Sequence, residues 1–158
     1  MRHALLICSL FLLGSTGCDG LDDCNELGGA VVTTFNLDFS RVDIKKQVNT
    51  GVFTAMIVEY VNSNVKGCSS PTDTCPRPVK VVANAPVKQG EKRDLVKYGV
   101  ITRIMTDGSV FKDLKEGFIV FDELGDVGSH AEGEFYGTFI DGITINGKFC
   151  GDVKQLGQ

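Results

Sequence analysis

The chain has 158 residues, which suits one domain of ordinary size. A hydrophobic fraction of 42%, a charged fraction of 23% and a net charge of −4 favour a globular protein and argue against wholesale disorder and against nucleic-acid binding. Glycine is abundant, with 19 residues, and tryptophan is absent, so we expect many turns.

Residues 1–17 have the pattern of an export signal. Arg2 supplies a positive charge, an uncharged and mostly apolar run covers residues 4–13, and small residues follow. A helix of ten residues is about 15 Å long, half the thickness of a bilayer core, so the run is too short to remain as a membrane span. We predict a signal peptide and a mature chain that lies outside the bilayer.

The stretch from Leu13 to Cys18 resembles the lipobox of bacterial lipoproteins, in which cleavage precedes a cysteine that carries diacylglycerol. Thr16 and Gly17 are of the accepted type, whereas Ser15 stands where the family usually has leucine. The resemblance implies that Cys18 is acylated and anchors the protein to the inner or outer membrane of a bacterial cell envelope. Ordinary cleavage after Gly17 gives the alternative, a secreted or periplasmic soluble protein.

Four cysteines remain when the signal peptide and an acylated Cys18 are set aside, an even number that suits two disulfides in an exported protein. Cys68 and Cys75 bracket a loop with proline that can fold back locally, so we pair them. Cys24 is then paired with Cys150. A structural zinc site needs four suitably spaced ligands, so disulfides are favoured over metal and no cofactor is predicted.

Residues 18–29 are acidic and rich in glycine, which is typical of a solvated tether. The acids lack the 12-residue loop pattern of a calcium site, so a tether is the preferred interpretation. Residues 30–154 are rich in β-branched side chains and predict an all-β domain.

The first expected strands lie between residues 31 and 61. Apolar and polar residues alternate over 31–39 and again over 42–48, as in half-buried strands, and residues 52–61 are apolar on both sides. Between the strands expected at 42–48 and 52–61, a three-residue turn at 49–51 would pair Val48 with Val52 and Ile44 with Met56.

The middle of the chain predicts a loop followed by three strands. Prolines exclude a central strand from residues 66–78. Strands are expected at 79–85, 99–105 and 118–124, and residues 90–97 suit either a loop or one helical turn.

The C-terminal hairpin can be placed in register. A three-residue loop with Gly142 in the left-handed conformation pairs Phe139 with Ile143 and brings the large residues of both strands to one face. The other pairs are then Gly137 with Ile145, Phe135 with Gly147, and Gly133 with Phe149.

The repeated Gly-x-Phe spacing over residues 133–139, continued by Gly147-x-Phe149, resembles small β-sandwich domains of uncharacterised bacterial envelope lipoproteins. The similarity covers about residues 117–153. It implies a fold and an envelope location, without an activity.

Candidate catalytic groups are few. His130 is the one histidine of the mature chain and is expected in an exposed loop, where Ser129 is too near in sequence to be its nucleophile. Glycosidase chemistry would need two acids facing one another across a cleft. The acids near predicted turns are Asp122, Glu123, Asp126, Glu132, Glu134 and Asp141. Acids interrupt the basic stretch 88–97, which therefore predicts a solvated face.

These observations predict an antiparallel β-sandwich or flattened barrel of about seven to nine strands, with no catalytic residues. The expected function is a non-enzymatic envelope lipoprotein that binds an envelope protein or polymer, and no nucleic acid. The alternative is a lipocalin-like carrier of an apolar ligand, and a hydrolase is a third class. A cavity of several hundred Å³ would favour the carrier, whereas a core filled by aromatic residues would favour the binding module. The expected core aromatics are Phe35, Phe39, Phe53, Phe121, Phe135 and Phe139.

Overall fold

A computed structural model describes residues 24–68 and 74–157. These residues form an almost all-β fold with nine strands, which confirms the predicted class. The elements along the chain are β1 (Glu26–Gly28), the short 3-10 helix η1 (Ala30–Thr33), β2 (Arg41–Asn49), β3 (Val52–Val61), β4 (Arg77–Asn84), β5 (Arg93–Asp94), α1 (Leu95–Tyr98), β6 (Gly99–Ile104), β7 (Leu114–Leu124), β8 (His130–Phe139) and β9 (Thr144–Gln155).

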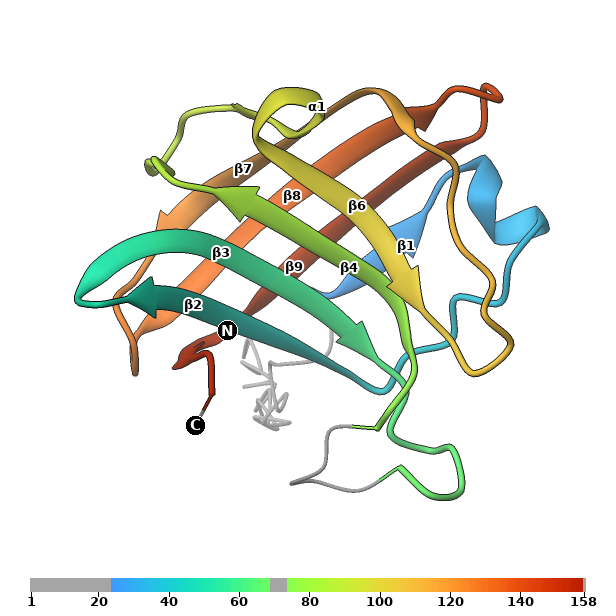
Figure 1. The fold of residues 1–158 in the computed structure, drawn as a ribbon, viewed down its shortest axis with the longest axis horizontal. Coiled ribbons are helices and arrows are strands. Elements are labelled where there is room, and N and C mark those ends of the chain that lie inside the picture. Colours follow the sequence, from blue (N-terminus) through green and yellow to red (C-terminus); the bar gives the residue numbers. More distant parts are fainter. Residues whose placement is uncertain (1–23, 69–73, 158) are drawn as a thin grey trace, which may run out of the picture.

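The strands form one sheet in the order β5-β7-β8-β9-β2-β3-β4-β6, and β1 also pairs with β9. Only the pairing of β2 with β9 is parallel. The sheet curls on itself, so that β2, β3, β4 and β6 form a front layer and β7, β8 and β9 form a rear layer (Figure 1). Helix α1 joins the two end strands, which leaves a nearly closed, flattened barrel.

The C-terminal hairpin has the predicted register. Gly137 pairs with Ile145, Phe135 with Gly147, and Gly133 with Phe149, as expected. Phe139 N donates to Ile143 O at 2.9 Å, and Gly142 has a φ of 83°, as the bulged turn requires.

Aromatic side chains from both layers fill the interior. Tyr60 of the front layer lies 6.0 Å from Phe135 of the rear layer, measured between ring centroids, and Phe121 lies 5.1 Å from Phe149. All four are at most 2% exposed. Of the six aromatics expected in the core, Phe121, Phe135 and Phe139 are buried, whereas Phe35, Phe39 and Phe53 pack against its margin.

The strand predicted at residues 31–39 is wrong. Gly29, with a φ of 98°, leads into η1, and no strand follows before Arg41. The alternating apolar side chains pack against interior residues instead of pairing in the sheet: Phe35 contacts Phe111 and Phe39 contacts Tyr60. The period of two over residues 35–39 therefore reflects burial of alternate side chains without strand pairing, and residues 31–33 belong to η1.

The turn predicted at residues 49–51 is also wrong. Thr50 and Gly51 have φ values of 50° and 79°, so the turn has two central residues, and their left-handed conformations suit the twist of the hairpin. A bulge between Gln47 and Val48 shifts the register by a further residue. Val48 consequently pairs with Phe53, and Ile44 with Val58.

The end of the predicted tether belongs to the fold. Residues 26–28 form β1, which pairs with residues 146–148 of β9. Backbone hydrogen bonding thus orders a stretch whose acidic and glycine-rich composition indicated a solvated linker.

Candidate functional site

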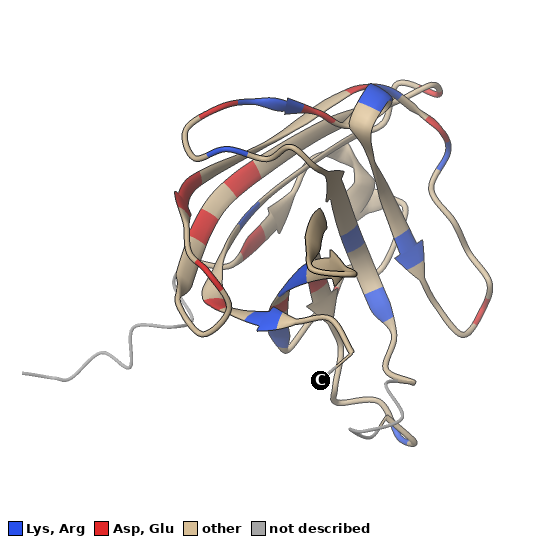
Figure 2. Cartoon of the chain, turned by 60° about the vertical axis from the view of Figure 1, so that its left-hand side comes forward, with Lys and Arg blue, Asp and Glu red and all other residues tan. Residues whose placement is uncertain are grey.

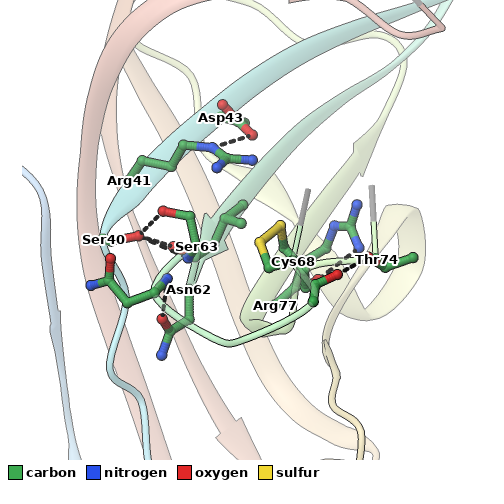
Figure 3. Close-up of a disulfide and its surroundings, with 12 residues drawn as sticks. Ser40, Arg41, Asp43, Asn62, Ser63, Cys68, Thr74 and Arg77 are labelled. Carbon is green, nitrogen blue, oxygen red and sulfur yellow. Dashed lines mark hydrogen bonds and ion pairs between the residues drawn. A yellow bond between two sulfur atoms is a disulfide. The ribbon is translucent and has the colours of Figure 1, made fainter. Parts of the chain in front are cut away.

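The structure brings together both predicted cysteine pairs. The Cα atoms of Cys24 and Cys150 are 5.9 Å apart, and those of Cys68 and Cys75 are 4.5 Å apart. The second disulfide closes the loop between β3 and β4 (Figure 3). Cys18, the predicted acylation site, lies outside the described residues.

His130 is the first residue of β8 and pairs with Asp152 of β9, so it belongs to a strand end rather than to a loop. Its side chain is 37% exposed, and its Nε2 lies 3.9 Å from Glu132 Oε2. Glu132 and Glu134 occupy alternate exposed positions along the same strand, and Asp126 forms an ion pair of 2.7 Å with Lys46. The predicted acids thus lie along an outer surface.

The basic stretch 88–97 is partly ordered by contacts. Lys88 forms an exposed ion pair of 3.4 Å with Glu91, and Arg93 donates to the carbonyl oxygens of Asn84 and Ala85. Within residues 24–68 and 74–157, no group of three or more His, Cys, Asp or Glu residues is placed to hold a metal ion. Within the same residues, no helix is long and apolar enough to cross a bilayer.

A groove with an aromatic floor lies on the outer side of β5, β7 and β8. We call it the aromatic groove; its volume is about 490 Å³, and it is lined by Lys92, Asp94, Val96, Lys115, Glu116, Gly117, Phe118 and Tyr136. Phe118 and Tyr136 pair across β7 and β8, with ring centroids 6.0 Å apart and planes inclined by 31°. Their adjacent rings give the groove its apolar surface.

Charged and polar groups surround these rings. Lys92 Nζ lies 4.0 Å from the centroid of Phe118, a cation–π contact. The Tyr136 hydroxyl is 3.0 Å from Thr138 Oγ1, which donates to Glu116 Oε1 at 3.1 Å. The groove therefore combines two aromatic rings, one of them covered by the Lys92 ammonium group, with ammonium donors and carboxylate acceptors on one concave surface.

The front layer carries a second polar cluster, centred on Glu59, which is 2% exposed. Its Oε2 is 2.7 Å from Lys45 Nζ, and its Oε1 is 2.9 Å from Lys80 Nζ and 3.0 Å from Arg77 Nε. Burial alone would raise the pKa of Glu59, but the hydrogen bonds and charges of Lys45 and Lys80 outweigh it and hold the pKa at about 2. Glu59 is therefore ionised at neutral pH.

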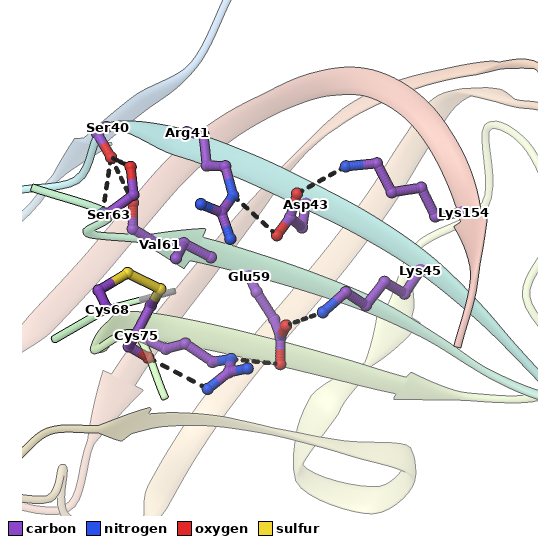
Figure 4. A network of polar contacts seen from close by, with 11 residues as sticks. Ser40, Arg41, Asp43, Lys45, Glu59, Val61, Ser63, Cys68, Cys75 and Lys154 are labelled. Atoms are coloured by element: carbon purple, nitrogen blue, oxygen red, sulfur yellow. Dashed lines mark hydrogen bonds and ion pairs between the residues drawn. A yellow bond between two sulfur atoms is a disulfide. The ribbon is translucent and has the colours of Figure 1, made fainter. Parts of the chain in front are cut away.

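Asp43 forms a neighbouring cluster on β2 and is 5% exposed. Its two carboxylate oxygens lie 2.9 Å from Lys154 Nζ and 3.1 Å from Arg41 Nε (Figure 4). Burial opposes ionisation, but these two cations lower the pKa of Asp43 below its ordinary value. Both buried acids are thus covered by longer cationic side chains on the outer side of the front layer.

These clusters were not predicted from the sequence. Residues 52–61 were expected to form a central strand that is apolar on both sides and covered on both faces, although Glu59 interrupts the run. In the fold, Glu59 pairs in register with Asp43 on one side and Lys80 on the other. The aliphatic stems of lysine and arginine cover this acid on the outer side of the strand. The one available signal was an acid inside an apolar strand between two strands that carry Lys and Arg.

The three tyrosines have different environments. Tyr60 is fully buried, and burial raises the pKa of its hydroxyl. Arg93 stacks on Tyr98 at 3.9 Å, and Tyr136 lies in the aromatic groove. Only Tyr136 joins a second aromatic ring on a concave outer surface.

Comparison of the chain with models of protein families, with curated proteins and with solved structures finds no match.

Proposed function

We propose that the protein is a lipid-anchored component of a bacterial cell envelope that binds another envelope component through the aromatic groove, without catalysing a reaction. The observation that carries the binding role is the pairing of Phe118 with Tyr136 on an outer sheet face beside charged groups of both signs. The anchor is proposed from the resemblance of the sequence around Cys18 to a lipobox.

The filled interior favours this function over that of a lipocalin-like carrier. Phe121, Phe135, Phe139 and Phe149 are at most 2% exposed and pack with the front layer in one core. The aromatic groove, in contrast, opens on the outer side of the sheet. A partner held there would contact side chains that are already ordered by strand pairing, which lowers the entropy lost on binding.

The lining of the groove suits macromolecular recognition. Aromatic side chains supply large contact areas and are enriched where a few residues carry most of the binding free energy. Lys92 and Glu116 stand at polar positions around the rings, where charge pairs determine orientation and partner choice. An envelope protein with an exposed apolar side chain and flanking charges of both signs fits this surface.

The non-enzymatic assignment rests on the placement of the titratable groups. His130 stands at an exposed strand end next to Glu132, and the acids of β8 point outward along a strand. General acid–base or nucleophilic catalysis needs such groups to converge on one reacting atom.

Site-specific photocrosslinking in the native envelope tests the binding role. A photoreactive residue at Tyr136 should capture a discrete partner, identified by mass spectrometry. The matched control is Val52, which is 64% exposed at the start of β3. Capture at Val52 and not at Tyr136 would refute the aromatic groove as the binding surface.

A further inference from the structure

We propose that the outer side of the front layer lies against the anionic headgroups of the membrane that holds the anchor. The surface concerned is made by the cationic side chains over Glu59 and Asp43. We call it the basic face, and it consists of Arg41, Lys45, Arg77 and Lys80 of the front layer together with Lys154, on the end of β9 that pairs with β2. The proposal rests on the lipid anchor at Cys18, which is part of the proposed function.

The basic face has an excess of positive charge at its surface. Its acids are buried, with side chains 3% exposed at Glu59 and 7% at Asp43. Its cationic side chains are more exposed, at 60% for Lys154, 39% for Arg41, 24% for Lys80, 16% for Lys45 and 9% for Arg77. Asp152 is exposed on the same side of β9, because its neighbour Val153 points into the core. Counting Asp152, five cations still exceed three acids.

The rear layer has the opposite character. Its exposed acids are Glu116, Asp122 and Glu123 on β7 and Glu132 and Glu134 on β8, and they outnumber its exposed lysines, Lys115 on β7 and Lys148 on β9. Most acidic residues lie on the strands toward the left of Figure 2, and basic residues predominate on the strands toward the right. The protein has a net negative charge but carries its cationic excess on the front layer and the adjoining end of β9, and an anionic bilayer would attract this side more strongly than the opposite one.

The length of the chain outside the described residues brings this surface close to the bilayer. The disulfide fixes Cys24 to Cys150 on β9, and Cys24 is six residues from Cys18. Six residues span at most about 20 Å, even when fully extended. Lys154 is four residues beyond Cys150 on the same side of the same strand, a distance of about 13 Å.

The anchor allows either the front layer or the rear layer to face the bilayer, and the charges of the two layers determine which orientation is favoured. Cys150 pairs with Glu132 of the acidic layer, while Val153 of the same strand pairs with Ile44 of the front layer. The tether therefore leaves the domain at the boundary of the two layers. Attraction within about one Debye length, about 8 Å at physiological salt, favours the orientation with the basic face toward the lipid.

Lysine acylation, measured by peptide mass spectrometry, tests the orientation. The protein is reconstituted in vesicles of phosphatidylcholine alone or with phosphatidylglycerol. A second preparation, the chain from Cys18 onward coupled through the Cys18 thiol to a maleimide lipid, provides the anchor whether or not the native residue is acylated. Lys154 and Lys80 should react about fivefold more slowly in the anionic vesicles, the factor expected for one cationic side chain at such a surface.

Lys88 is the internal control, because its side chain is 66% exposed outside the basic face, and its labelling should not change. A K80Q/K154Q variant should lose the dependence on anionic lipid while a K88Q/K92Q variant keeps it; each buried acid of the first variant retains at least one cation. Equal labelling of Lys154 in both vesicles, or slower labelling at Lys88 instead, would overturn the proposal. Absence of lipid on native Cys18, with protection in the coupled protein, would refute the anchor and leave the orientation supported.

Discussion

The hairpin of β8 and β9 and the outer side of the front layer both depend on the two-residue period of a strand, but they use it differently. In the hairpin, the inward positions alternate large apolar residues with glycines, and most outward positions are exposed or half-buried. In β3, Glu59 is outward and is nevertheless 2% exposed. Complementary side-chain shapes fix the register of the hairpin, whereas ion pairs compensate the charge of the acid buried in β3.

The glycines of the hairpin show how shape determines register. A Cβ at Gly133 would lie 2.0 Å from the carbonyl oxygen of Val120 and 2.9 Å from the ring of Phe149. A Cβ at Gly147 would lie 2.5 Å from the ring of Phe135. Each glycine therefore leaves room for the aromatic residue opposite, and a shifted register would place a side chain there.

Glu59 determines the stability of the charged region. E59Q should destabilise the protein by about 4 kcal/mol, because it removes the charge that compensates three cations at a buried site. The free energy of unfolding, measured with urea, checks the value. The control is E116Q, which alters an exposed acid on β7 and should change stability by less than about 0.5 kcal/mol. A similar small effect for E59Q would show that the buried cluster does not contribute to stability.

Two glycines of β8 test the role of shape in the hairpin. G133A should destabilise by about 3 kcal/mol, because its Cβ meets backbone that cannot move independently. G137A should have a smaller effect, about 1 kcal/mol, since its Cβ meets the ends of the Ile101 and Leu114 side chains. Thermal and urea unfolding of the two variants provide the comparison. Equal losses of stability in G133A and G137A would mean that replacing a strand glycine is destabilising in itself, whatever atoms the new Cβ contacts.

The charged region should also respond to acid. The pKa of Glu59 falls from 4.5 to about 2 on folding, so its contribution is complete above pH 4.5 and is lost as the pH falls through about 2. Between pH 4.5 and 2.5 the loss should be about 2 kcal/mol. Urea midpoints measured over this range should decrease more steeply for the native chain than for E59Q. Parallel curves would assign the acid sensitivity to other carboxylates.

The difference between the hairpin and the charged region of the front layer also explains which features could be predicted from the sequence. The register of the C-terminal hairpin followed from matching large residues with glycines, since few alignments satisfy both strands. Both disulfide partners also followed, because Cys68 and Cys75 are close along the chain and leave one pairing for Cys24. Local spacing contained the necessary information in each case.

Long-range contacts limited the remaining predictions. Phe35 and Phe39 alternate with polar residues but pack against Phe111 and Tyr60 rather than pairing in the sheet. The aromatic groove needs Lys92 and Tyr136, which are distant in sequence, and the cluster at Glu59 needs three strands in register. No local pattern contains that information.

The proposed function depends on membrane attachment through Cys18. Mass spectrometry of the N-terminal peptide from the native protein tests this attachment. We expect this peptide to begin at Cys18 and to carry diacylglycerol and an amide-linked acyl chain, which together give stable anchoring. C18S should accordingly move the protein from the membrane fraction to the soluble fraction. A native N-terminal peptide without lipid, together with membrane retention of C18S, would contradict the claim.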